Sequence, residues 1–328
     1  MSDQEILLQV KNLKTHFFTR RGVVKAVDGV SFSVRRGEAL GIVGESGCGK
    51  SVTCLSILRL VPEPAGQIIE GEILFNGHDL LKKDEAEMRR YRGNHISLIP
   101  QDPMTSLNPV FTIGDQMTAP LKVHKKLSHS HALEQAEALL GMMHIPSPEQ
   151  RLKQYPHQMS GGMRQRILGG IAISCNPQLL IADEPTTALD VISQDQFIRV
   201  LKDIQTRQHL SMIWITHDMS VVARTCDRVA VMYAGKIVET ASVEDLFLHP
   251  AHPYTKGLMN SIPRLDQNHA ELFTIPGHPP DLVNLPPGCR FAPRCKEMME
   301  ICLKKHPPLT PTKGEHSVSC WLMKENDG

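Results

Sequence analysis

Apolar residues in the first 80 positions occur in short runs of the kind that form strands. Three runs are rich in β-branched residues and are separated by glycines: residues 6–10, 25–34 and 39–43. We therefore predict three strands, followed by a buried helix at residues 51–60. Residues 66–80 predict a β-hairpin that turns at Asn76 and Gly77, because this dipeptide favours tight two-residue turns.

The periodicity changes in the middle of the chain. From about residue 104 to residue 173 the apolar positions follow a helical spacing, which predicts a helical block inside a strand-rich chain. Two later apolar runs, 179–184 and 211–216, predict buried strands with a helix between them up to about residue 207. Strands and helices that alternate in this way indicate an α/β fold.

Length and charge narrow the class of protein. The 328 residues are many for one core and suggest one large domain with an extension, or two domains. The net charge is +1 with acidic and basic residues interspersed, so we expect no nucleic-acid partner. No apolar stretch approaches the roughly 18 residues of a membrane span, and the N-terminus lacks a signal-peptide pattern. These features predict a cytosolic protein that contacts any membrane through a partner.

Residues 44–51, GESGCGKS, fit the phosphate-binding pattern G-x-x-x-x-G-K-[ST] and follow an apolar run, as such a loop must. Glycines let the backbone curl so that N–H groups point at a polyphosphate, and the following helix adds its positive end. We expect Lys50 to reach the β- and γ-phosphates and Ser51 to bind Mg²⁺. All eight loop residues are candidates for nucleotide binding: Gly44, Glu45, Ser46, Gly47, Cys48, Gly49, Lys50 and Ser51.

Two carboxylates end the apolar run 179–184, at the strand end where open α/β sheets place their ligands. Asp183 is a candidate partner of Mg²⁺, and Glu184 is a candidate to polarise an attacking water molecule. A solvated acidic turn before Pro185 is the alternative. His217 follows the run 211–216 and is a candidate contact for the γ-phosphate, with a structural role as the alternative.

Two other positions allow a structural and a functional interpretation. In MSGGMRQR, residues 159–166, Ser160 fits the N-cap of a helix that runs to about residue 174. The same helix N-terminus is also suited to receive an anion. Phe17 is expected either to pack in the core or to form a platform on which a purine stacks.

In order and spacing, six elements resemble the motif set of ABC-type ATPases over about residues 5–245: GESGCGKS, Gln101, SGG at 160–162, LLIADE at 179–184, ALD at 188–190 and His217. The resemblance implies a P-loop cassette with a mixed sheet core, an antiparallel β subdomain and a helical subdomain at about 104–173. It also implies that two cassettes meet head to tail and hold ATP between the loop of one and the SGG helix of the other.

The resemblance also implies roles for single residues. Lys50 would act on the phosphates, Glu184 would be the general base, and His217 would be the switch that contacts the γ-phosphate. Gln101 would touch Mg²⁺ and sense a membrane partner. The remaining contacts would come from Phe17 on the adenine, from Ser160, Gly161 and Gly162 on the γ-phosphate of the partner's ATP, and from Asp190 at the interface.

Beyond about residue 246 the chain is rich in proline and histidine, so we predict a cassette at 1–245 and an extension at 246–328. Four of the eight cysteines lie there: Cys289, Cys295, Cys302 and Cys320. Zinc sites usually contain a closer pair, so these spacings favour a [4Fe-4S] cluster, with buried free thiols as the alternative. HPYT at 252–255 and PPGCRFAPRC at 286–295 are similar to the extension of ATPase subunits of dipeptide and oligopeptide importers, some of which bind such a cluster.

These resemblances imply an ATPase that uses ATP and Mg²⁺ to power peptide import, as a peripheral subunit on the cytoplasmic side of the membrane. Its partners would be two transmembrane permease subunits, a homologous second ATPase in a heterodimer and, indirectly, an external peptide-binding protein. Nickel complexes or haem are alternative cargoes. A soluble ABC ATPase acting on nucleic acids or ribosomes is the alternative class, although the chain has no long coiled-coil insertion, second cassette or basic arm.

Overall fold

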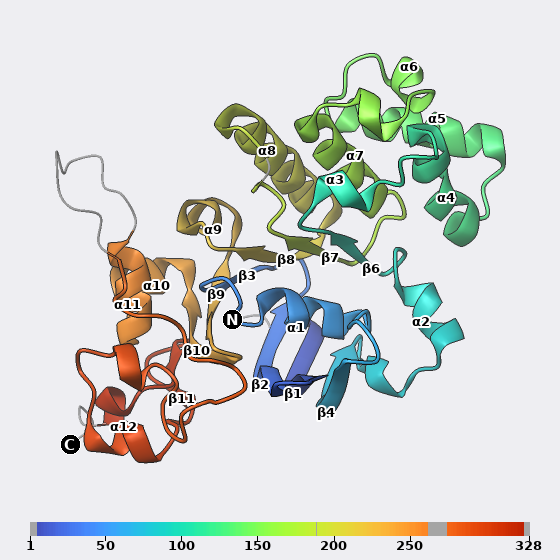
Figure 1. Cartoon of the computed structure of the whole chain (residues 1–328). Coiled ribbons are helices and arrows are strands. Elements are labelled where there is room, and N and C mark those ends of the chain that lie inside the picture. The colour runs from blue at the N-terminus through green and yellow to red at the C-terminus, as the bar shows by residue number, and fades with distance from the viewer. Residues whose placement is uncertain (1–4, 188, 262–273, 325–328) are drawn as a thin grey trace. The chain divides into compact units, whose positions relative to one another are not determined.

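The computed structural model describes residues 5–187, 189–261 and 274–324, and the chain divides into two compact units. The described residues of 1–7, 34–39 and 82–215 form a helix-rich unit, and those of 8–33, 40–81 and 216–328 form a sheet-rich unit. Figure 1 colours the chain by residue number, from blue at the N-terminus to red at the C-terminus. Both units contain fully buried apolar side chains, such as Leu140 in the first and Val229 in the second.

A parallel sheet of three strands lies in the helix-rich unit, in the order β8-β7-β6. The strands are β6 (Ile96–Ile99), β7 (Leu179–Asp183) and β8 (Ser211–Thr216). Every residue of β7 and β8 is buried, as expected for parallel strands covered on both faces. The pairs Ile99↔Ala182 and Asp183↔Ile215 place the carboxyl ends of the strands at one edge. The predicted strands in this region are confirmed.

The α-helices of this unit are α2 (Glu85–Tyr91), α3 (Pro103–Ser106), α4 (Ile113–Lys125), α5 (His129–Met142), α6 (Pro148–Leu152), α7 (Gly161–Ile173) and α8 (Val191–Gln208). Residues 103–173, all of which the structure describes, contain helices and turns but no strand. The helix α5 buries Ala132, Ala136 and Leu140, which recur every four residues and so form one apolar face.

The sheet-rich unit has an antiparallel sheet of order β2-β1-β4-β5 and a second set of strands of order β11-β12-β10-β9-β3. The first contains β1 (Ile6–Thr19), β2 (Gly22–Arg35), β4 (Gly66–Phe75) and β5 (His78–Asp79). The second contains β3 (Ala39–Val43), β9 (Arg228–Tyr233), β10 (Lys236–Ser242), β11 (Thr310–Pro311) and β12 (Ser317–Val318). Only the pair β3–β9 is parallel within this set, so the sheet is mixed.

Three local predictions in this unit have different outcomes. The hairpin is confirmed, since Phe75 pairs with His78 and both Asn76 and Gly77 have the positive φ of a tight turn. The first two strands are longer than predicted, and most of the added residues are half-buried or exposed and so lie outside the apolar runs. The helix predicted to reach residue 60 is α1 (Lys50–Ile57), and the left-handed backbone of Arg59 accompanies its earlier end.

The remaining helices of the sheet-rich unit are α9 (Met219–Thr225), α10 (Val243–Leu248), α11 (Pro253–Asn260) and α12 (Glu300–Lys304). Residues beyond 245 join the sheet through β12, which pairs with β10 at Glu239↔Val318 and Thr240↔Ser317. The carboxylate of Glu239 is fully buried and accepts N–H groups from Ala251 and His252, at 2.8 and 2.9 Å. It also bonds to His316 Nε2 at 2.7 Å, so one side chain fastens two segments of the extension.

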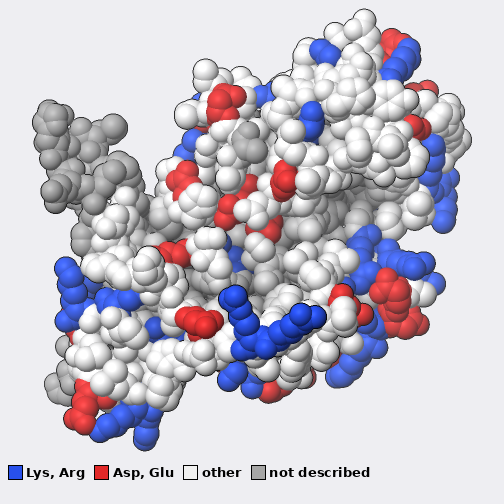
Figure 2. Space-filling model, viewed as in Figure 1, with Lys and Arg blue, Asp and Glu red and all other residues white. Residues whose placement is uncertain are grey.

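Within the described residues, no helix combines the length and the apolar character needed to cross a bilayer. On the face drawn in Figure 2, acidic and basic side chains are interspersed among uncharged ones. The whole sequence has 36 Lys and Arg residues and 35 Asp and Glu residues, which gives the net charge of +1.

Candidate nucleotide-binding site

The predicted phosphate loop connects β3, which ends at Val43, to α1, which begins at Lys50. Gly44 and Gly49 have positive φ angles of 155° and 106°. A Cβ atom at Gly44 would lie 2.2 Å from the carbonyl oxygen of Met232, and one at Gly49 would lie 2.2 Å from that of Ala26. Only glycine fits these positions, because the curled backbone passes directly against neighbouring strands.

Lys50 places its ammonium group inside this curve. Its Nζ donates to the carbonyl oxygens of Gly44 and Glu45, at 2.7 and 3.0 Å, and the residue is 5% exposed. The N-cap of α1 is Gly49, which offers no side-chain acceptor, so the first amides of the helix lack a side-chain cap. The tip of the loop, Ser46 and Gly47, is exposed. A buried cation and a helix N-terminus therefore meet in one loop that is open at its tip, as anion binding requires.

Two residues of the extension, Arg294 and Tyr254, bind the loop residue Glu45, and neither contact was predicted from the sequence. Arg294 binds the carboxylate of Glu45 through two hydrogen bonds, and the Glu45 amide donates to Tyr254 Oη at 2.8 Å. The sequence carried a partial signal, since a nearby cation stabilises a carboxylate that lies beside a polyphosphate. The partner itself lies 249 residues away and was not predictable from the loop.

Phe17 and His217 also belong to the sheet-rich unit. Phe17 on β1 pairs with Gly66 on β4, where the missing side chain leaves room for the half-buried ring. His217 follows β8 and is exposed. Their predicted contacts with adenine and with the γ-phosphate stay predictions.

The predicted carboxylates lie in the helix-rich unit, at the end of β7. Asp183 is buried, and Glu184 adopts a left-handed conformation with φ 43°. Positive φ is uncommon for a residue with a Cβ atom and often marks a functional position. Gln101, just beyond β6, donates from Nε2 to Glu184 Oε2 at 3.1 Å, and Thr187 Oγ1 donates to the same oxygen at 3.2 Å. The structure therefore brings together two residues that are 83 positions apart.

The SGG segment and Asp190 form a second group in this unit. Ser160 caps α7 by accepting the N–H of Met163 at 3.3 Å, so the predicted N-cap is confirmed. Asp190 caps α8 by accepting the amide and the hydroxyl of Ser193, at 2.9 and 2.7 Å, and these bonds hold the pKa of its carboxyl below the ordinary value. A Cβ atom at Gly162 would lie 3.6 Å from Ser193 Oγ, so the N-termini of the two helices are neighbours.

The predicted [4Fe-4S] cluster is wrong for the structure described. In residues 5–187, 189–261 and 274–324 no group of three or more His, Cys, Asp or Glu side chains is arranged to hold a metal. The four cysteines of the extension, Cys289, Cys295, Cys302 and Cys320, are free thiols that line a small cavity. The cavity measures about 10 Å³, which is room for about one water molecule.

The four thiols are free, but only Cys302 is buried, whereas Cys289, Cys295 and Cys320 are half-buried. Burial raises the pKa of Cys289 to about 11, and it also raises the pKa of Cys295 and Cys320. With no metal bound, a thiol with a raised pKa stays protonated at neutral pH. The prediction that the four cysteines lie close together is confirmed, but the prediction that they bind an iron–sulfur cluster is wrong.

Comparison with known proteins agrees with this geometry. Residues 27–187 match the family model described as ABC transporter, and residues 238–302 match the one described as oligopeptide/dipeptide transporter, C-terminal region. The chain is 52% identical over 321 residues to the dipeptide transport ATP-binding protein DppD of Bacillus subtilis, covering 98% of this chain and 96% of the relative. It is 50% identical over 319 residues to the oligopeptide transport ATP-binding protein AppD of the same organism, covering 97% of each.

Solved structures give the same fold. The dimeric ATP-binding cassette MJ0796 in a post-hydrolysis state with ADP and Pi matches with a TM-score of 0.66 and 24% identity. The match covers 72% of this chain and 98% of that cassette. The predicted fold class, an α/β cassette with a mixed sheet, an antiparallel sheet and a helical block, is confirmed.

Proposed function

The chain belongs to the ABC transporter family, in the branch of dipeptide and oligopeptide transport ATP-binding proteins, and from this membership we propose that it hydrolyses ATP to power the import of peptides. The observation that carries the proposal is the phosphate loop, with the ammonium of Lys50 buried inside its curve. In the proposal Lys50 and the loop amides bind the β- and γ-phosphates. Phe17 stacks on the adenine ring.

Magnesium accompanies ATP in this proposal. Ser51, Gln101 and Asp183 offer a hydroxyl, an amide oxygen and a carboxylate, and hard oxygen donors of this kind suit Mg²⁺. Gln101 uses its Nε2 to bind Glu184, which turns that nitrogen toward the acid. The ion, when bound, neutralises charge on the phosphate oxygens.

Glu184 is the proposed general base. Gln101 and Thr187 both donate to its Oε2 and thereby fix the orientation of the carboxylate. A carboxylate fixed in this way can orient a water molecule and accept its proton as the water attacks the γ-phosphorus. Because the transition state spreads negative charge over the γ-oxygens, Lys50, His217 and helix N-termini contribute mainly by electrostatic stabilisation.

A second ATPase completes the proposed site. Ser160, Gly161 and Gly162 form the N-terminus of α7, next to Asp190 at the N-terminus of α8. A helix N-terminus with a serine hydroxyl and two glycine amides suits a phosphate group. The proposal is that this group contacts the ATP held by a partner ATPase, which is a homologous but different chain.

Membrane attachment is also proposed to go through partners. The segment that follows Gln101 exposes apolar side chains of Met104, Val110 and Phe111. Exposed apolar groups that cluster in this way indicate a protein contact. We assign this contact to two transmembrane permease subunits, which places the chain at the cytoplasmic side of the membrane and makes an external peptide-binding protein an indirect partner.

The proposal is tested first by Lys50→Ala, with Lys153→Ala as the matched control, since Lys153 is exposed and pairs with Glu149 on α6. Calorimetric titration of the full chain with Mg·ATP is expected to show at least about 100-fold weaker binding for the first variant and no change for the second. Equal affinity of Lys50→Ala and the original chain would contradict the assignment of the loop.

Peptide import is tested in proteoliposomes that contain the permease subunits and both ATPases. Uptake of a labelled dipeptide is expected to require ATP and to stop with Lys50→Ala. If ATP is hydrolysed but no di- or oligopeptide enters, then the cargo part of the proposal is wrong while the ATPase part stands.

A further inference from the structure

Glu45 is an acidic residue inside a loop that is suited to bind a polyphosphate. It follows Gly44 directly, and its carbonyl oxygen accepts a hydrogen bond from Lys50. A carboxylate beside a bound phosphate repels it, and the repulsion is stronger where protein partly replaces water. The side chain of Glu45 is 26% exposed, so solvent screens its charge only in part.

Arg294 from the extension balances this charge. Its Nη1 donates to Glu45 Oε2 at 2.7 Å and its Nη2 donates to Glu45 Oε1 at 2.9 Å, which is the two-pronged geometry that guanidinium and carboxylate groups favour. The hydrogen bonds that Arg294 donates to Glu45 are the main cause of a rise in the pKa of Arg294. The pair therefore carries no net charge beside the loop.

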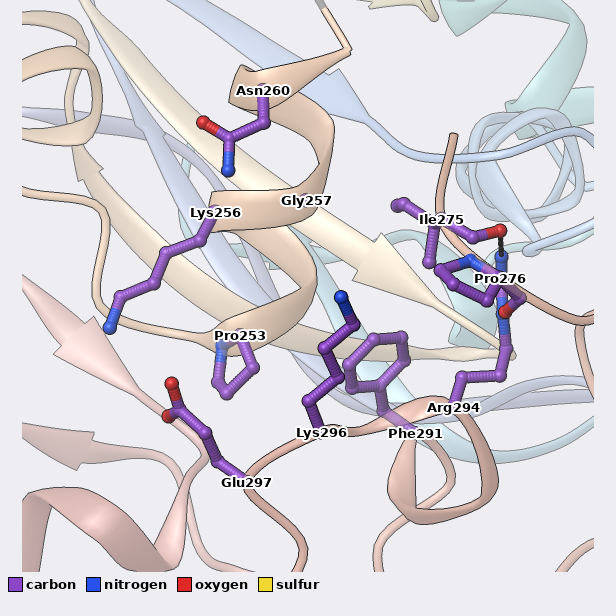
Figure 3. A pocket seen from close by; sticks show the side chains of 10 residues that line it. All are labelled: Pro253, Lys256, Gly257, Asn260, Ile275, Pro276, Phe291, Arg294, Lys296 and Glu297. Atoms are coloured by element: carbon purple, nitrogen blue, oxygen red, sulfur yellow. Dashed lines mark hydrogen bonds between the residues drawn. The ribbon is translucent and has the colours of Figure 1, made fainter. Parts of the chain in front are cut away.

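The guanidinium is itself held firmly. Its Nε donates to the carbonyl oxygen of Pro276 at 2.9 Å, and Nη2 also donates to that of Ile275 at 3.2 Å. The rings of Tyr233 and Phe291 lie 5.7 and 5.9 Å from its central carbon, within cation–π distance. Figure 3 shows Arg294 at the wall of a pocket, beside Phe291 and with the 275–276 segment next to its guanidinium. Only 4% of the side chain is exposed.

Tyr254 fixes the backbone of the same loop residue. Its Oη accepts the amide N–H of Glu45 at 2.8 Å, and the residue is fully buried. The ring packs against Tyr233 and Phe291, with ring centroids 4.6 and 5.5 Å away. Tyr254 is the third residue of HPYT, so this motif, which carried the resemblance to the importer extension but no predicted contact, supports the loop.

We infer that the C-terminal extension is part of the nucleotide site, with Arg294 and Tyr254 as positioning residues that hold Glu45 and keep its charge from opposing the phosphates of ATP. The inference rests on the proposed function, since it assumes that the loop binds ATP. It goes further by making nucleotide affinity depend on residues about 210 to 250 positions beyond the loop.

A merely structural tether is the competing explanation, and the chain contains a matched control for it. Arg290, also in the extension, pairs with Asp28 and donates to the carbonyl oxygen of Ala234. Its side chain is 7% exposed. These bonds tie the extension to β2 and to the residue after β9, and neither partner is a loop residue, so Arg290→Ala removes a comparable tether.

The experiment measures the affinity of the purified full chain for Mg·ATP by calorimetric titration. Arg294→Ala is expected to weaken binding about tenfold, because it leaves the Glu45 carboxylate uncompensated. The double variant Glu45→Gln with Arg294→Ala is expected to recover to within about threefold of the original chain, because the repelling charge is gone. Arg290→Ala is expected to lower the melting temperature and to change the affinity less than about twofold.

Two results would overturn the inference: an equal loss of affinity in Arg294→Ala and Arg290→Ala, or no recovery on adding Glu45→Gln. If Arg294→Ala does not fold, Arg294→Gln with and without Glu45→Gln decides by the same comparison, since glutamine removes the positive charge but keeps a long polar side chain. Tyr254→Phe gives an independent measurement of the backbone contact, with weaker binding expected and unchanged binding counting against that contact.

Lys50→Ala in the same titration separates this inference from the proposed function. If Lys50→Ala binds ATP normally, the loop is not the nucleotide site and both ideas fail. If Lys50→Ala loses binding and Arg294→Ala does not, only the role of the extension fails.

Discussion

Gln101 Nε2 donates to Glu184 Oε2 across 3.1 Å, and this bond joins the segments that follow two neighbouring parallel strands. A displacement of the segment after β6 therefore acts on the carboxylate of Glu184, after β7, through this hydrogen bond. Because Gln101 also begins the segment with exposed apolar residues, the bond gives a short physical route from the proposed docking surface to the proposed base.

The first prediction concerns Glu184→Gln. The amide cannot accept a proton, so turnover of ATP in the assembled transporter is expected to fall by at least about 100-fold. The Mg·ATP affinity should stay within about threefold, because the substitution is nearly isosteric and the loop is untouched. The measurement is phosphate release alongside nucleotide binding, with Glu149→Gln on the exposed face of α6 as control. Wild-type turnover in Glu184→Gln would rule out the assignment.

Ser160 provides the second prediction, since two substitutions separate its cap from its proposed contact with a partner's ATP. Ser160→Asp preserves the N-cap of α7, whereas Ser160→Ala removes it at a cost of about 1 kcal/mol in unfolding free energy. A carboxylate facing a γ-phosphate is repelled, so Ser160→Asp is expected to be as stable as the original chain yet inactive in the assembly. An active Ser160→Asp transporter would show that Ser160 serves only as a cap.

The third prediction concerns the buried carboxylate of Glu239. Glu239→Ala leaves two amides and His316 without their acceptor, so the unfolding free energy is expected to fall by about 3 kcal/mol. Glu239→Gln keeps an acceptor oxygen and should lose less. Denaturant unfolding is best followed by Trp321 fluorescence in a Trp214→Phe background, since the chain has two tryptophans. Exposed Glu134→Ala is the control, and an equal effect there would contradict the role of Glu239.

The fourth prediction is a pH dependence that arises from His252. Burial lowers its pKa to about 3, and its Nδ1 accepts the N–H of Tyr254 at 3.0 Å. The unfolded chain, with an ordinary pKa near 6.5, takes up the proton first on acidification. The stability from neutral His252 is therefore present above about pH 6.5 and is lost as the pH falls toward 3, by at most about 1.4 kcal/mol per pH unit.

His252→Asn tests that pH dependence. Asparagine is a good N-cap for α11 and does not titrate, so the helix start is kept while the pH-dependent term is removed. The difference in unfolding free energy between the two chains should shrink or reverse between pH 7 and pH 4. Parallel pH profiles would show that His252 is not the source.

Local features of the site were predictable from sequence because each is fixed by near neighbours. The glycines of the loop, the carboxylates at the end of β7 and the turn at Asn76 all follow from short-range sterics and periodicity. Helix α1 ends earlier than predicted. The prediction followed the apolar spacing, which continues past Arg59, whereas the left-handed backbone of Arg59 is incompatible with a longer helix.

Long-range features of the site were not predictable in the same way. Arg294 meets Glu45 only because the extension folds back on the sheet-rich unit, and no local signal specifies that distance. For the four cysteines of the extension, a predicted cluster was wrong. Spacing along a chain does not reveal how large a cavity the side chains enclose or whether the thiols are protonated.

The pairing of β12 with β10 has a consequence for how the chain can be shortened. β10 has β9 on one side and β12 on the other. A chain cut after residue 245 would leave the N–H and C=O groups of Glu239 and Thr240 on a bare edge, and bare edges recruit strands from other molecules. Trimming the protein to its cassette would thus yield an aggregation-prone fragment instead of a smaller working enzyme.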